Sequence, residues 1–129
     1  MRTLLPEGWP RPSGYANGIE AIGRTIFVAG QIGWDTEGRF PETFVGQLDQ
    51  TLANTIAVLE AGDAGPENIV RMTWYLTDLD AYRNALADVS AIWKRRIGRV
   101  YPAMAVIGVS GLVEREAMIE IETTAVVAD

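Results

Sequence analysis

Two glutamates near the end of the chain have the residue type and spacing best suited to catalysis. Glu120 and Glu122 alternate within Ile119-Glu120-Ile121-Glu122, and alternating residues of a β-strand point to the same face of a sheet. By itself this pattern favours a solvated face. If another subunit covers that face, however, the carboxylates are withdrawn from water and become suited to moving protons.

Residue types that the chain lacks narrow the chemistry further. The 129 residues contain no cysteine and no histidine, which excludes a cysteine nucleophile, a Ser-His-Asp triad, a Cys/His zinc site and disulfide bonds. The sequence also has no glycine-rich motif of the kind that cradles nucleotide phosphates. A metal site would have to be built from carboxylates alone, and we expect none. Acid–base chemistry must depend on carboxylates, tyrosine or a held water molecule.

Composition and charge indicate the class of protein. The apolar content of 48% and the charged content of 22% are typical of a globular chain, and the length suits a single domain, residues 1–129. The net charge of −6 argues against a nucleic-acid partner, because phosphate binding depends on clustered Lys and Arg. No apolar run is long enough to span a membrane and no secretory signal is visible, so we expect a cytoplasmic protein without a membrane partner.

Five further residues could line a ligand site, and each of them has an alternative role in the fold alone. Gly30-Gln31 ends a predicted strand, where a glycine either lets a ligand approach the backbone or simply starts a loop. Tyr15 begins a strand and is more typical of a half-buried core residue, whereas Trp34 could line a pocket or belong to the core. Arg71 lies on a strand and needs a partner, which could be one of the two glutamates or water.

These residues must be positioned by a small set of helices and strands. Three prolines predict an extended arm over residues 1–13. Apolar residues recur every three or four positions in 42–61 and 79–97, which predicts two amphipathic helices. Glycines, with β-branched and aromatic residues between them, indicate the strands. The predicted strands are residues 15–22, 25–31, 69–76, 103–110 and 117–127.

The resulting order, β-β-α-β-α-β-β, favours an α+β fold in which both helices cover one face of a mixed sheet. The opposite face then has no cover, and we expect it to carry apolar side chains. The expected residues are Val28, Met72, Trp74, Ala105 and Ile107. Because a large bare apolar face is not tolerated in a monomer, we predict a homo-oligomer packed sheet to sheet.

An ordered set of short motifs over residues 13–127 resembles the Rid family, the YjgF-like reactive-intermediate deaminases. The motifs are Ser13-Gly14-Tyr15, Val28-Ala29-Gly30-Gln31-Ile32, Val58-Leu59-Glu60-Ala61-Gly62, Tyr75-Leu76-Thr77-Asp78, Pro102-Ala103 and Ile119-Glu120-Ile121-Glu122. The resemblance implies a chorismate-mutase-like fold assembled as a homotrimer, with a small-molecule ligand in clefts between subunits. It also implies cofactor-independent hydrolysis of enamines and imines to keto acids and ammonia.

The resemblance further implies roles for single residues. Glu120 would act with a bound water, Gly30 and Gln31 would contribute backbone groups, and Tyr15 would line the cleft. Active members carry an arginine after Pro-Ala that holds the substrate carboxylate, and Met104 stands in its place. A charge-assisted hydrogen bond of that kind contributes roughly 1.5–3 kcal/mol. Its loss therefore predicts about a 10- to 150-fold weaker action on small imino acids.

Two functions are compatible with this altered site. In the first, the protein is a hydrolytic deaminase for an enamine or imine that is larger or less acidic than 2-iminobutyrate-type imino acids. Met104, Tyr15 and Trp34 would shape its pocket, and Arg71 or Arg99 could replace the missing arginine. In the second, a non-catalytic trimer binds or senses a small metabolite in the inter-subunit cleft. RNA cleavage, a label sometimes attached to the family, is disfavoured by the acidic composition.

Overall fold

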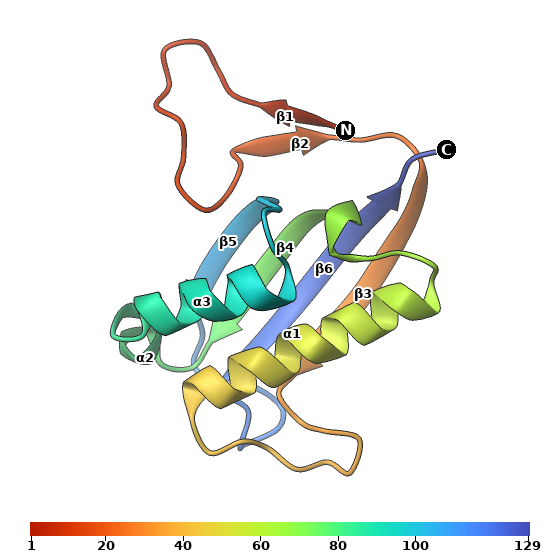
Figure 1. Cartoon of the computed structure of the whole chain (residues 1–129). Helices are drawn as coiled ribbons and strands as arrows, with labels where there is room; N and C mark the ends of the chain where they lie inside the picture. Colours follow the sequence, from red (N-terminus) through yellow and green to blue (C-terminus); the bar gives the residue numbers. More distant parts are fainter.

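A four-stranded mixed sheet with helices on one side forms the body of the computed structural model, which describes residues 1–129 (Figure 1). The strand order is β3-β6-β4-β5. A separate two-stranded ribbon, β1-β2, lies beyond one end of the sheet (Figure 1). The elements are β1 (Arg2–Leu4), β2 (Gly18–Glu20), β3 (Arg24–Ile32), α1 (Phe44–Ala61), a 3-10 turn (Pro66–Asn68), β4 (Ile69–Leu76), α2 (Leu79–Arg83), α3 (Leu86–Arg96), β5 (Ala103–Gly108) and β6 (Ile119–Val127).

The last strand of the chain occupies the centre of the sheet. β6 pairs antiparallel with both β3 and β4, which places Trp74 opposite Ile121. β5 pairs parallel with β4, with Met72 opposite Met104. A parallel pair needs a long crossover, and α2 and α3 supply it. This α+β arrangement, with its mixed sheet, confirms the predicted fold class.

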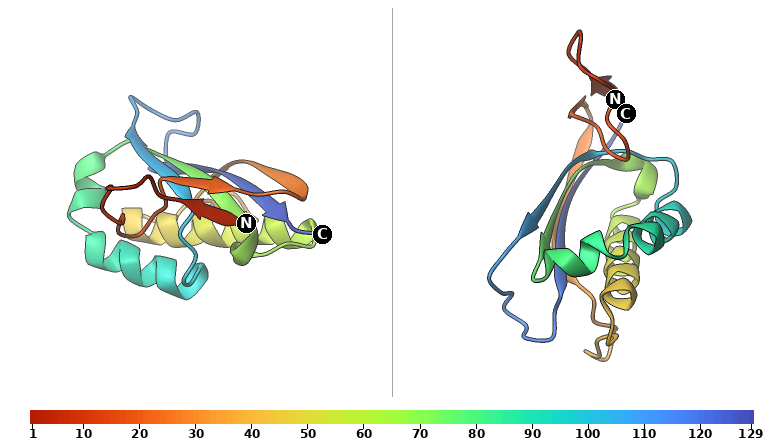
Figure 2. Two further views of the ribbon diagram at one scale, coloured as in Figure 1. Left: turned by 90° about the horizontal axis from the view of Figure 1, so that it is seen from above. Right: turned by 90° about the vertical axis from the view of Figure 1, so that its left-hand side faces the viewer.

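The helix-covered face of the sheet holds most of the core. Alternate residues of the two central strands point toward the helices and are at most 2% exposed. They are Ile69, Met72, Trp74, Leu76, Ile119, Ile121 and Ala125. Helix α1 adds Leu48, Leu52 and Leu59, which are fully buried. Figure 2 shows that all the helices lie on this one side of the sheet and that its opposite face carries none.

The prediction for the uncovered face was therefore wrong for three of its five residues. Val28, Met72 and Trp74 are buried under the helices. Because side chains alternate along a strand, Ala105 and Ile107 of β5 lie on the uncovered face, and both are exposed. The sequence shows that side chains alternate between the two faces of each strand, but it does not show which of the two sets packs against the helices.

Helix α1 begins two residues later than predicted and ends as predicted. Thr43 caps its N-terminus, since the threonine hydroxyl accepts a hydrogen bond of 3.0 Å from the amide of Gly46. Gly62 is the C-terminal cap, and its amide donates to Leu59 at 2.9 Å. The buried Thr51 satisfies its hydroxyl within the helix by donating to the carbonyl of Gln47 at 2.7 Å.

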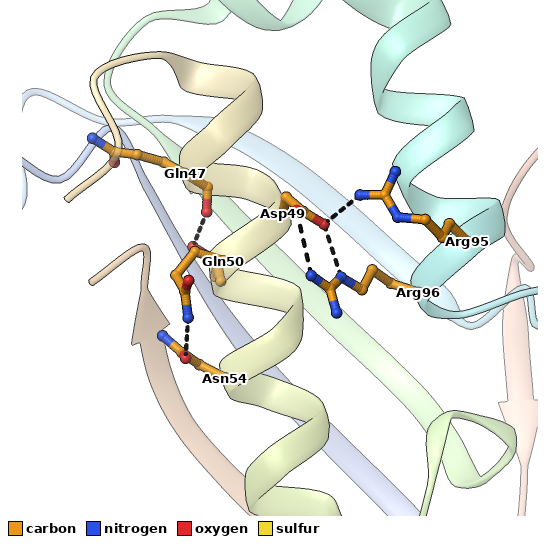
Figure 3. Close-up of polar contacts among 7 residues, drawn as sticks. Gln47, Asp49, Gln50, Asn54, Arg95 and Arg96 are labelled. Atoms are coloured by element: carbon orange, nitrogen blue, oxygen red, sulfur yellow. Dashed lines mark hydrogen bonds and ion pairs between the residues drawn. The ribbon is translucent and has the colours of Figure 1, made fainter. Parts of the chain in front are cut away.

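An ionic link joins the two long helices (Figure 3). The Asp49 carboxylate of α1 accepts hydrogen bonds from Arg95 at 2.7 Å and from Nε of Arg96 at 2.8 Å, both on α3. The bond from Arg96 and then that from Arg95 outweigh the opposing effect of burial and lower the pKa of Asp49. This link fixes the last turn of α3 against α1.

The second predicted helix, residues 79–97, is divided into α2 and α3, so the structure has three α-helices. Asp78 caps α2 as expected, accepting from the amides of Asp80 and Ala81. The break falls at Asn84 and Ala85, where Asn84 ends α2 by donating its amide to the Asp80 carbonyl at 2.9 Å. None of the helices has both the length and the apolar character needed to cross a membrane.

The N-terminal segment is also more ordered than an extended arm. β1 pairs antiparallel with β2, and the strand predicted over residues 15–22 is limited to Gly18–Glu20. Just before it, Ala16 forms a bridge to Ala103, and its amide donates to the Pro102 carbonyl at 2.9 Å. This contact brings residues 13–15 to the start of the edge strand β5.

Candidate functional site

A large cavity lies at the β5 edge, between the covered face of the sheet, α2, α3 and residues 13–15. Its volume is about 1060 Å³, at the upper end of the usual range for small-molecule sites. It is lined by Ser13, Gly14, Tyr15, Trp74, Tyr82, Leu86, Val89, Ser90, Trp93, Lys94, Gly98, Arg99, Tyr101, Met104 and Val106. Two predicted site residues, Tyr15 and Met104, are thus brought together here.

Aromatic rings form much of the cavity wall. Trp74 lies edge-on to Tyr82, with ring centroids 6.3 Å apart, and tilted to Trp93 at 6.0 Å. The indole N–H of Trp93 donates to the carbonyl of Val100 at 3.2 Å, whereas the buried indole N–H of Trp74 has no hydrogen-bond partner. Tyr15 and Tyr101 add two exposed rings at the opening. The wall therefore suits a flat, apolar group.

The charged residues of the cavity all have one sign. Lys94 and Arg99 line it, and no aspartate or glutamate does. Neither of these two cations takes part in an ion pair. The sequence leaves the position of Arg99, a candidate replacement for the missing arginine, undetermined, and the structure places Arg99 at this cavity.

A second group of predicted residues lies on the opposite, uncovered face, where β3 and β6 meet. Glu120 projects over Gly30: a Cβ atom added to that glycine would lie 2.5 Å from Oε2 of Glu120. Gly30 lies inside β3 and does not start a loop; its missing side chain leaves room for the carboxylate, whose flexible end would have to move for any larger residue. Glu120 forms no ion pair and accepts no side-chain hydrogen bond, so its oxygens are available to water or a ligand.

Tyr75, which was not predicted as a site residue, is the neighbour of the second glutamate, Glu122. Its hydroxyl donates to Oε1 of Glu122 across the β4–β6 pair. This hydrogen bond raises the pKa of the Tyr75 phenol, since ionisation would place a second negative charge beside the carboxylate. The alternation of Arg71, Thr73 and Tyr75 on one face of β4 was the signal that could have revealed it.

The remaining candidates form no ion pair and no side-chain hydrogen bond with either glutamate. Arg71 is exposed on the uncovered face and forms no ion pair with either glutamate. The Gln31 side chain donates to the carbonyl of Ala29 at 3.1 Å. Trp34 lies in the loop after β3, 5.9 Å from the Phe40 ring, and does not line the cavity.

Within one chain the two groups of candidate residues do not meet. Tyr15 and Met104 lie on the covered side at the β5 edge, whereas Gly30 and Glu120 lie on the uncovered side near the β3 edge. The two edges are separated by β4 and β6. A site that uses both groups therefore needs a second subunit.

Comparisons with known proteins agree with the fold and the motifs. The family model described as Endoribonuclease L-PSP matches residues 10–127. A crystal structure from Yersinia pestis, of the Rid family protein YyfB of unknown function, has a TM-score of 0.85 at 32% identity, covering 98% of each chain. This chain belongs to the same family, the RidA/YjgF or Rid family.

Two curated relatives extend the comparison over almost the whole chain. A RutC family protein of Aquifex aeolicus is 34% identical over 128 residues, which cover 98% of this chain and 99% of the relative. An Escherichia coli protein named 2-iminobutanoate/2-iminopropanoate deaminase is 29% identical over 127 residues, 97% of each chain. The family assigned from the sequence motifs is confirmed.

Proposed function

We propose that this protein is a hydrolytic deaminase that converts an imine or enamine and water to a carbonyl compound and ammonia. The observation that carries the proposal is the Glu120 carboxylate, which lies over Gly30 without an ionic partner on a face that no helix covers. The name of the Escherichia coli relative supports the reaction class. No cofactor is needed for this chemistry.

Glu120 acts on water in the proposed reaction. Its carboxylate takes a proton from the water as the water oxygen bonds to the C=N carbon, and the imine nitrogen gains a proton. The resulting carbinolamine then breaks its C–N bond: nitrogen leaves as ammonia with a proton returned through Glu120, and the hydroxyl loses its own proton to become the carbonyl. Backbone groups at Gly30 and Gln31 hold the reacting group.

The proposed enzyme is a homotrimer of this single domain. Phe27 and Ile107 are 79% and 43% exposed on the uncovered face, and a neighbouring subunit would remove them from water. Such contacts would also bring the Tyr15 and Met104 side of one chain to the Gly30 and Glu120 side of the next. A ring of three identical heterologous contacts closes this arrangement.

The cavity indicates a substrate larger than 2-iminobutanoate. Met104 supplies an apolar and adaptable side chain where an arginine would hold a small acid, and the volume of about 1060 Å³ far exceeds a four-carbon compound. Removing the arginine weakens the binding of small imino acids, and enlarging the apolar wall favours bulky ones. We therefore place the natural substrate among larger or less acidic imines.

Ammonia release tests the proposal directly. Imines are generated in the assay from small and from bulky amino acids with an amino-acid oxidase, and Glu120→Gln is compared with the wild type and with Glu122→Gln. General acid–base catalysis is worth about 10²–10⁴-fold, so Glu120→Gln should lose activity by that factor, while Glu122→Gln stays within about threefold. Equal rates for wild type and Glu120→Gln would contradict the proposal.

A second candidate function is ligand binding without turnover, and Met104 is the observation that favours it. In that case a ligand recovered from the protein is chemically unchanged, no imine is hydrolysed, and Met104→Arg creates an activity that the wild type lacks.

RNA cleavage, which the description of the family model names, fits poorly with a net charge of −6. Salt-sensitive RNA cleavage by the purified protein would support RNA cleavage as its function instead.

A further inference from the structure

We infer that the cavity at the β5 edge selects substrates that combine an aromatic or bulky apolar group with a carboxylate, and that Arg99 binds the carboxylate. This inference rests on the proposed function and names the substrate class of that site. The missing arginine at position 104 is then compensated from a different element, the turn that follows α3.

The charges of the cavity support an anionic ligand. The chain has a net charge of −6, yet Lys94 and Arg99 are the only charged residues among the fifteen that line the cavity. Their neighbours on α3 serve a different purpose, because Arg95 and Arg96 are both bound to Asp49 (Figure 3). Of the four cations in residues 94–99, the two without an acidic partner, Lys94 and Arg99, are the two that line the cavity, so a ligand carboxylate can satisfy them.

The backbone around Arg99 is held in place on both sides. Gly98 has a φ of 87°, a conformation that favours glycine, and its amide donates to the carbonyl of Trp93 at 3.0 Å. The indole of the same tryptophan donates to the carbonyl of Val100 at 3.2 Å. Arg99 therefore follows a fixed turn whose anchor, Trp93, is itself part of the cavity wall.

Arg71 does not fit this role. It lies on β4 between Val70 and Met72 with its side chain exposed, and it is absent from the cavity lining. Since Met72 points to the helices, its neighbour Arg71 points to the opposite face of the sheet. Lys94 carries a compact ammonium group, whereas the guanidinium of Arg99 can bind a carboxylate through two parallel hydrogen bonds. We therefore assign the carboxylate to Arg99.

The cavity wall explains the preference for a bulky group. Five of the fifteen lining residues are aromatic, namely Tyr15, Trp74, Tyr82, Trp93 and Tyr101. Rings of this kind bind flat apolar groups by stacking or edge-on contact. A small imino acid would leave most of the volume filled with water, so its binding would gain little from the wall.

Direct binding of stable ketones separates this inference from catalysis. The probes are 2-oxo-4-phenylbutanoate, the small acid 2-oxobutanoate, and 4-phenylbutan-2-one, in which a methyl group replaces the carboxylate. Calorimetric titration should show the first probe binding at least about tenfold more tightly than either of the others. Arg99→Gln should weaken the first probe by about 10- to 100-fold and leave the uncharged ketone unchanged.

Arg95→Gln is the matched control, since it removes the same charge from the end of α3 but lies outside the cavity lining. It should leave all three affinities unchanged, and the thermal midpoints of both variants should show that they fold. Equal weakening by the two substitutions, or equal affinity for the two acids, would overturn the inference. A different result would separate the two proposals. If the wild-type protein binds the phenyl acid through Arg99 but releases no ammonia from any imine, the proposed reaction is wrong and the assignment of the ligand to this cavity still holds.

Discussion

The two faces of the sheet are built from the same strands but are completed in different ways. On the helix-covered face, Trp74 and Ile121 are at most 2% exposed and pack against helices of the same chain. On the opposite face, which also carries Glu120, Phe27 and Ile107 remain exposed. The covered face is thus completed by helices of the same chain, whereas the uncovered face carries the Glu120 carboxylate and no helix.

This difference shows how the fold separates stability from function. The core needs only residues of one chain, so its energetics are local to that chain. The proposed site would draw on both faces, because Tyr15 and Met104 lie at the cavity on one side and Gly30 and Glu120 lie on the other. Substitutions on the two faces should therefore be distinguishable by what they change.

The largest expected effect comes from comparing isoleucines on the two faces. Ile121→Ala removes a fully buried side chain and should lower the free energy of unfolding by about 2–5 kcal/mol. Ile107→Ala removes a partly exposed one and should cost about 1 kcal/mol or less at protein concentrations where the chains are dissociated. Urea denaturation of both variants measures the difference, and equal losses would contradict the division into two faces.

A charge on the uncovered face should act on assembly instead. Phe27→Asp places a carboxylate where the proposed subunit contact is made, so the association constant should fall at least tenfold, or about 1.4 kcal/mol. Val113→Asp is the control, because that side chain is 96% exposed in the loop between β5 and β6. Sedimentation velocity separates the two variants. An unchanged mass for Phe27→Asp would place the subunit contact elsewhere.

The smallest expected effect concerns the ionic link between the helices. The folded pKa of Asp49 is lowered from 3.8, so its stabilisation is present above that value and disappears as the pH falls through the folded pKa. Asp49→Asn should cost about 1 kcal/mol at pH 7, and its stability should depend less on pH in the acid range. Asp80→Asn, at an exposed pair with Arg83, controls for the loss of a surface carboxylate. Parallel acid dependence in the wild type and Asp49→Asn would contradict this role.

The sequence predicts most elements of this fold because their periodic patterns are local. The spacing of apolar residues marks α1, and the strand predicted over residues 69–76 matches β4 in the structure. The division between α2 and α3 was missed because Tyr82 and Leu86 continue one apolar stripe across Asn84. The β1–β2 pairing was missed because two strands of three residues carry too little periodicity.

The candidate site is less predictable because it depends on register and on turns. The contact of Glu120 with Gly30 follows from an irregular pairing of β3 with β6, with a register shift between Val28 and Gln31. No spacing in the sequence reports that shift. Likewise, Arg99 reaches the cavity only because Gly98 turns the chain after α3. The family resemblance named Glu120 and Gly30, but the geometry that joins them is a property of the folded chain.

Subunit complementation tests most directly whether the two faces form one shared site. Glu120→Gln removes the proposed base, and Met104→Trp places a bulky ring in the proposed binding position of the same chain, so each variant alone should lose most of its ammonia release. If each site pairs the base of one subunit with the cavity of the next, random mixing restores about a quarter of the sites, and activity should recover to about that fraction. A mixture no more active than its two parents would contradict a site shared between subunits.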